Sequence, residues 1–204
     1  MTRAWTVRAL TWIGTTAVGW LLAWWIGLFL TMVAYSVTFP LMKALEAAAL
    51  GRIQSTIIGF LSGLGGGLFG GTVGALGQWY AGPPHTRRNP AWIPATMACY
   101  GLVLASSWAI SWPDPFSGGW LAILVGAMAG SLASIGHLFA MRGSALRWQL
   151  WVAGSTVAWG TGLAATFLWA QRPFAGELVA GGMIGLITLG TLGIATRTKP
   201  NQGD

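Results

Sequence analysis

Charged residues are scarce in this sequence. Of its 204 residues, 11 are Lys or Arg and four are Asp or Glu, so only 7% are charged. A soluble domain carries roughly a quarter. The chain is also 54% apolar, with a mean hydropathy of +0.63, and it cannot cover itself with a polar surface. These features exclude an ordinary soluble domain and indicate an integral membrane protein.

Residues that carry catalytic chemistry are equally few. The single Cys99 cannot form an intrachain disulfide. No Ser-His-Asp set, metal cluster or phosphate-binding loop occurs, and we therefore expect no enzyme. Proton-coupled transport needs a carboxylate within an apolar run, and this sequence places its acids only at the ends of such runs or between them. These acids are Glu46, Asp114, Glu177 and Asp204.

Six apolar runs have the length, about 20 residues, that a helix needs to cross a membrane. The connection Val33–Arg52 is the only long one, and its Pro40 and apolar spacing predict a short amphipathic helix at the interface. An extension of the first run is the alternative interpretation. The runs cover about Ala9–Met32, Ile53–Tyr80, Ala91–Trp112, Gly118–Met141, Trp148–Ala170 and Gly176–Thr196.

The basic residues alternate between the two sides of these runs. With the N-terminus inside, eight lie inside and three outside, which satisfies the positive-inside rule. We therefore expect a multi-pass protein of a bacterial-type inner (cytoplasmic) membrane with both termini cytoplasmic. Because the charges are scattered, a nucleic-acid partner is not expected. The inner set is Arg3, Arg8, Arg87, Arg88, Arg142, Arg147, Arg197 and Lys199, and the outer set is Lys43, Arg52 and Arg172.

One pattern occurs three times: an Arg, a Trp, a Ser or Thr and a second aromatic, each four residues after the last. Residues four apart lie on one stripe of a helix. The copies lie at the start of the first, third and fifth runs, and the second, fourth and sixth runs are rich in small residues. Gly71 of the second run aligns with Gly130 of the fourth, while the sixth run fits two registers. The copies are Arg8-Trp12-Thr16-Trp20, Arg88-Trp92-Thr96-Tyr100 and Arg147-Trp151-Ser155-Trp159.

This pattern predicts an all-α, single-domain bundle of six transmembrane helices arranged as three pseudo-repeated helical hairpins. Two repeat units cover about residues 53–112 and 118–170. The third joins residues 176–204 to residues 1–32, and the sixth span should therefore pack beside the first.

The repeat has a Gly-rich helix ending in Gln-Trp, a basic turn and a Trp-containing return helix. It resembles a repeat in uncharacterised polytopic bacterial membrane proteins, although His137 departs from the Gln-Trp form. The resemblance implies a membrane location and no activity. It is carried by Gly74, Gln78, Trp79, Arg88 and Trp92 in one hairpin, and by Gly130, Arg142, Arg147, Trp151 and Trp159 in the next.

The three motif Arg residues, Arg8, Arg88 and Arg147, have two interpretations. Cationic residues at the inner interface set topology and extend toward water. The same residues are a candidate ring for anionic lipid headgroups or for the acidic tail of a partner. The first Trp of each motif lies one turn further in, at an ordinary position of the aromatic belt.

The second aromatics of the motifs are Trp20, Tyr100 and Trp159. They lie about 18 Å from their Arg along the helix, beyond the usual belt. A buried indole N–H needs an acceptor, so these rings are expected to contact other helices, a lipid or a pigment, with packing favoured. Together with the three Arg, they are the candidate lipid- or partner-binding residues.

His137 is the only histidine within an apolar run. A hydrogen-bonded packing role is the favoured interpretation. The alternative is a cofactor site, in which His137 ligates a chlorin magnesium or a haem iron.

Three functional hypotheses follow. The first is a non-enzymatic structural or accessory subunit of a larger membrane complex, respiratory or photosynthetic, with membrane lipids and other integral subunits as partners. The second is a small-solute or lipid transporter or channel, with a hydrated path lined by Thr16, Thr96 and Ser155. The third is a pigment or haem binder that uses His137.

Overall fold

The computed structural model describes residues 3–47, 51–83, 89–111, 119–141, 147–169, 172 and 174–195. Within these residues all regular structure is helical, which confirms the all-α prediction, and each predicted run contains one helix. The helices are α1 Arg3–Ala47, α2 Gly51–Ala81, α4 Trp92–Ser111, α5 Gly119–Ala140, α6 Trp148–Leu168 and α7 Ala175–Ala195.

Five of these helices are long and apolar enough to cross a membrane, namely α1, α2, α4, α5 and α7. The exception is α6, which has 21 residues like α7. Its three Trp and its several Ser, Thr and Gly lower its mean hydropathy, because these side chains are polar, amphipathic or absent. A multi-pass membrane protein is therefore supported, and the crossing by α6 remains a prediction.

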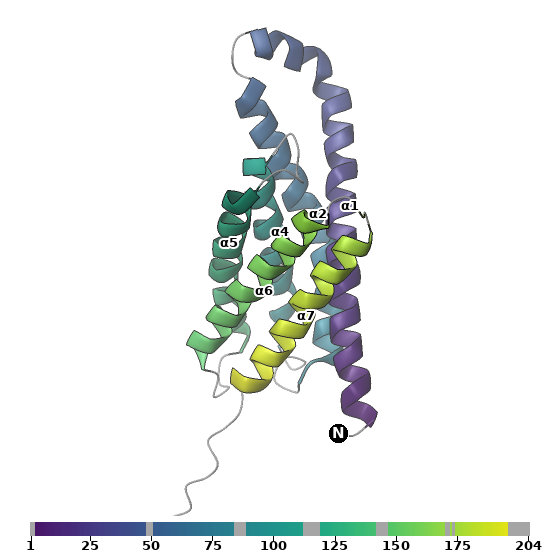
Figure 1. Cartoon of the computed structure of the whole chain (residues 1–204), viewed down its shortest axis with the longest axis vertical. Helices are drawn as coiled ribbons and strands as arrows, with labels where there is room; N and C mark the ends of the chain where they lie inside the picture. Colours follow the sequence, from purple (N-terminus) through teal and green to yellow (C-terminus); the bar gives the residue numbers. More distant parts are fainter. Residues whose placement is uncertain are drawn as a thin grey trace, which may run out of the picture.

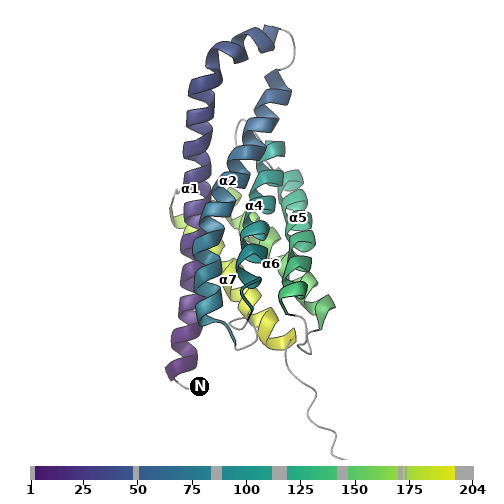
Figure 2. The ribbon, with the colours of Figure 1, turned by 180° about the vertical axis from the view of Figure 1, so that it is seen from behind.

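The helices contact one another in a closed ring, in the order α1, α2, α4, α5, α6 and α7 (Figures 1 and 2). The last helix, α7, returns to pack against the first, as the sequence analysis expected. Figure 2 shows α1 and α2 side by side along much of their length.

Glycines let α2 approach both of its neighbours closely. Gly66 and Gly70 face α1, while Gly63 and Gly67 face α4. A Cβ at any of these four positions would lie less than 3.0 Å from backbone atoms of the neighbouring helix. The four-residue glycine spacing of α2 thus serves backbone-to-backbone packing, which is how membrane helices gain contact without a hydrophobic driving force.

The α1 helix is much longer than the rest of the bundle requires. It has 45 residues, about 67 Å at 1.5 Å per residue, while α4 has 20. Figure 1 shows its last turns bending over the top of the molecule, and these turns include Pro40, which cannot donate a helical hydrogen bond. Residues 33–47 are therefore not a separate helix, and the alternative interpretation as an extension of the first span fits the helix bounds.

Candidate functional site

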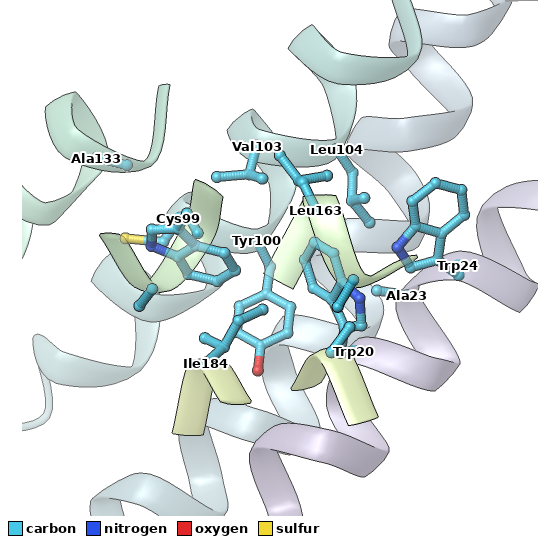
Figure 3. Close-up of a cluster of buried hydrophobic side chains, with 14 of the residues drawn as sticks. Trp20, Ala23, Trp24, Cys99, Tyr100, Val103, Leu104, Ala133, Leu163 and Ile184 are labelled. Carbon is cyan, nitrogen blue, oxygen red and sulfur yellow. The ribbon is translucent and has the colours of Figure 1, made fainter. Parts of the chain in front are cut away.

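The second aromatics of the three motifs meet at the centre of the helix ring, and we call Trp20, Tyr100 and Trp159 the deep triad. Their ring centroids are 5.9 Å apart for Trp20–Tyr100, 5.7 Å for Trp20–Trp159 and 5.1 Å for Tyr100–Trp159. Figure 3 shows Trp20 and Tyr100 side by side, with Trp24 further along α1. Two of the three contacts are edge-on, the arrangement that aromatic quadrupoles favour.

The deep triad is closed to its surroundings. The exposed fraction of its side chains is 0%, 0% and 4%, in chain order. A lipid or partner would have to displace ring-to-ring contacts to reach these residues, and the contacts themselves are the packing role that the sequence analysis favoured.

The first aromatics form a second layer, and we call Trp12, Trp92 and Trp151 the shallow triad. Trp92 is 5.8 Å from both Trp12 and Trp151, measured between ring centroids. All three side chains are at most 2% exposed. The prediction that they occupy an ordinary interfacial belt is therefore wrong: their stripe faces the bundle axis, and they pack as core residues.

The motif hydroxyls, Thr16, Thr96 and Ser155, are buried too. Thr16 Oγ1 donates to the Trp12 carbonyl at 2.7 Å and accepts from Gln78 Nε2 at 2.9 Å. The Thr16 carbonyl in turn accepts a hydrogen bond from the Tyr100 hydroxyl at 3.1 Å. Thr16 is one of the three residues expected to line a hydrated path, and its hydroxyl is thus hydrogen-bonded to protein groups.

Three glycines of the intervening helices face the deep triad. A Cβ added at Gly71, Gly130 or Gly181 would lie 2.9, 3.0 or 2.7 Å from the Cβ of Tyr100, Trp159 or Trp20, respectively. The sequence allows two alignments of the sixth run with the second and fourth runs. These contacts favour the alignment in which Gly181 corresponds to Gly71 and Gly130. Seven residues after each glycine stands a polar residue that bonds toward the axis, and these are Gln78, His137 and Thr188.

His137 lies between the rings of the shallow triad. Its ring centroid is 4.3 Å from that of Trp92 and 5.5 Å from that of Trp151. Its Nε2 is hydrogen-bonded to Thr96 Oγ1 at 2.9 Å, and its Nδ1 is 3.6 Å from Cys99 Sγ. Both ring nitrogens therefore already face protein groups, as the packing role predicts.

The described residues contain no group of three or more His, Cys, Asp or Glu able to hold a metal ion. A haem or chlorin on His137 would have to displace either Thr96 or Cys99, and the side chain is only 5% exposed. The contacts of this residue thus favour packing over ligation.

The motif Arg residues behave differently from the rings. Arg8 and Arg147 are exposed, and Arg88 lies outside the described residues. Arg8 lines a groove between α1, α2 and α7, and two of the groove's lining residues, Ala81 and Leu192, belong to the same buried cluster as the shallow triad. The backbone N–H of Arg147 donates to the Ala195 carbonyl at 3.0 Å and links the start of α6 to the end of α7.

One aromatic group escaped the sequence analysis. Trp24 contacts Trp108 at 5.1 Å and Phe167 at 6.2 Å, beyond the deep triad. The signal was present, because Trp24 continues the four-residue stride from Trp20, and Trp108 and Phe167 lie eight residues after Tyr100 and Trp159. The same stripe that forms the two triads thus carries a third aromatic layer.

Comparison with known proteins gives no match for this chain: no family model, no curated protein and no solved structure is similar to it.

Proposed function

We propose that this chain is a non-enzymatic integral membrane protein that serves as a structural or accessory subunit of a larger membrane complex. The observation that carries the proposal is an uncovered apolar surface on α1 between Trp25 and Tyr35. An apolar surface that its own chain leaves uncovered suits contact with another integral subunit.

The packing register locates this surface. Gly181 of α7 faces Ala17 and Trp20 of α1, and Phe174, just before α7, stacks on Trp25 with ring centroids 4.4 Å apart. Because the two helices run antiparallel, α7 begins level with Trp25. The rest of α1, through Ala47, continues past the start of its neighbour.

The uncovered part of α1 is apolar and hollowed. Residues from Trp25 to Tyr35 line a cavity of about 470 Å³. Phe29 and Met32 on this face are 63% and 69% exposed. Together with α2, the helix also reaches beyond the ends of α4, α5, α6 and α7 (Figure 1), and its 45 residues are longer than the hydrocarbon core, so lipid tails cannot cover all of its apolar side chains. A partner subunit would cover them.

The interior supports a structural role rather than transport. A channel requires a hydrated axis, whereas the deep and shallow triads fill the centre with buried rings in mutual contact. A haem or pigment role requires an available imidazole nitrogen, and both nitrogens of His137 face protein groups. Neither alternative gains support from these contacts.

We further propose that the bundle is a pseudo-threefold repeat of hairpins, closed by the two ends of the chain. Support comes from the meeting of the three motifs in two triads. It also comes from the equivalent places of Gly71, Gly130 and Gly181 against the deep triad. Such a repeat gives a rigid core from which the longer α1 extends.

The experiment is native electrophoresis of the tagged protein, produced at low level in its own membrane and extracted in a mild detergent. We expect it to migrate as part of a larger assembly. The double variant Phe29→Ala/Met32→Ala should shift most of the protein to the size of the free chain, because it removes two exposed anchors from the uncovered surface.

A matched control is Met128→Ala/Leu132→Ala, which removes similarly exposed apolar side chains from α5. This variant should migrate like the wild type. Migration of the wild-type protein alone would contradict the proposal.

A further inference from the structure

The end of the bundle where the chain begins holds a second concave feature. It is a groove of about 280 Å³ between α1, the end of α2 and the last turns of α7. Ala81, Leu189 and Leu192 supply apolar wall, and Trp5 and Arg8 stand on the α1 side. The groove is separate from the uncovered surface of α1, which lies beyond Trp25, further along the helix.

The groove has the character of an amphiphile site. Arg8 is exposed, and no acidic side chain in the described part of the chain pairs with it. Trp5 is 50% exposed, as an interfacial ring is. The apolar spans of α2 and α7 end here, at Ala81 and Ala195. An exposed cation therefore lies beside an apolar groove at the level where the apolar spans end.

We infer that this groove binds one anionic phospholipid of the leaflet that contacts the N-terminal end of the bundle. An acyl chain lies against Leu189 and Leu192, and the phosphate lies beside Arg8. A lipid fits better than a soluble anion, because most of the lining is apolar and the groove lies at the level where the apolar spans of α2 and α7 end.

The structure offers a way to fill the groove without disturbing the fold. A Cβ added at Gly193, on the groove wall, would meet no atom within 4 Å. Gly193→Phe should therefore occupy the slot and leave helix packing intact. A Cβ at Gly190, on the same helix but outside the groove lining, also meets nothing within 4 Å, and this makes Gly190→Phe a matched control.

The experiment titrates the purified full-length protein in mild detergent with dioleoyl phosphatidylglycerol or dioleoyl phosphatidylcholine, with bound lipid counted by native mass spectrometry. We expect the wild type to retain the anionic lipid preferentially. Arg8→Gln should weaken phosphatidylglycerol binding about fivefold, since one basic residue near the surface contributes about 1 kcal/mol, and leave phosphatidylcholine unchanged.

Gly193→Phe should abolish retention of both lipids, while Gly190→Phe and Arg172→Gln, which removes an exposed cation far from the groove, should match the wild type. Equal losses for Arg8→Gln and Arg172→Gln would overturn the inference, because they would show attraction by general surface charge. Unchanged binding in Gly193→Phe would overturn it as well, because the acyl chain would then lie elsewhere. Neither result bears on the assembly tested with Phe29 and Met32.

Discussion

The deep and shallow triads come from the same motif, in which a Ser or Thr separates the two aromatics, yet the two triads are packed differently. In the deep triad every ring touches the other two, and Trp20 Nε1 donates to Thr166 Oγ1 at 3.0 Å. In the shallow triad only Trp92 contacts both partners, and His137 fills the space beside it. The deep layer is a closed aromatic core, whereas the shallow layer is completed by the imidazole ring of His137.

The two triads also differ in how well their indole N–H groups are hydrogen-bonded. The indole nitrogens of Trp92 and Trp151 are buried without a hydrogen-bond partner among the described residues, and Trp12 Nε1 has only a 3.3 Å bond to Thr188. A buried unpaired N–H costs about 1–3 kcal/mol. The comparison teaches that the deep layer pairs the indole donor of Trp20, while the shallow layer buries two indole donors that have no partner in the described part of the chain.

The largest expected effect comes from breaking the deep triad. Trp20→Ala should lower the free energy of unfolding by about 3–5 kcal/mol, because it leaves a cavity among rings that cannot easily collapse. The measurement is the thermal midpoint of the detergent-solubilised protein, followed by the loss of helical circular dichroism.

Its control is Trp120→Ala, which removes a side chain that is 79% exposed and should change stability by less than about 0.5 kcal/mol. Equal midpoints for the two variants would show that the deep triad does not support the fold.

A smaller effect is expected from substitution of His137, which packs against the rings of the shallow triad. His137→Ala should cost about 2 kcal/mol, since it removes a ring packed on Trp92 and leaves Thr96 without its imidazole partner. His137→Gln should recover much of that loss, because Gln78, at the corresponding place of α2, reaches Thr16 in the same way.

Thermal midpoints of the two His137 variants provide the measurement. If Gln proves as damaging as Ala, the two positions are not equivalent and the proposed repeat loses one of its supports.

Much of the fold could be predicted, because its signals are local. Run length and hydropathy identified six helices, and the four-residue stride identified which side chains share a face. The stride could not say which way that face points. The sequence therefore predicts an ordinary aromatic-belt position for Trp12, whereas its side chain is 0% exposed and lies on the axis.

The other shortfalls arise from contacts that are distant in sequence. The register of α7 depends on Gly181 meeting Trp20, 161 positions earlier, and no local pattern encodes that pairing. The sequence does not decide the length of α1, because Pro40 is compatible with both a helix start and a bend within a helix. Trp24 was simply one step further along a stripe already recognised.

The smallest expected effect is a difference in thermal midpoint between two variants that remove an indole N–H donor, one from each triad. Trp20→Phe and Trp92→Phe both shrink a buried indole to a phenyl ring, and the cavity terms are therefore similar. Trp20→Phe also loses the bond to Thr166, worth about 0.6 kcal/mol between membrane helices. Trp92→Phe instead removes an unpaired N–H, and the relief offsets its cavity. Trp20→Phe should therefore have the lower thermal midpoint. The reverse order would mean that the Trp92 N–H has an acceptor, such as a bound water or headgroup, and that the two layers do not differ at this donor.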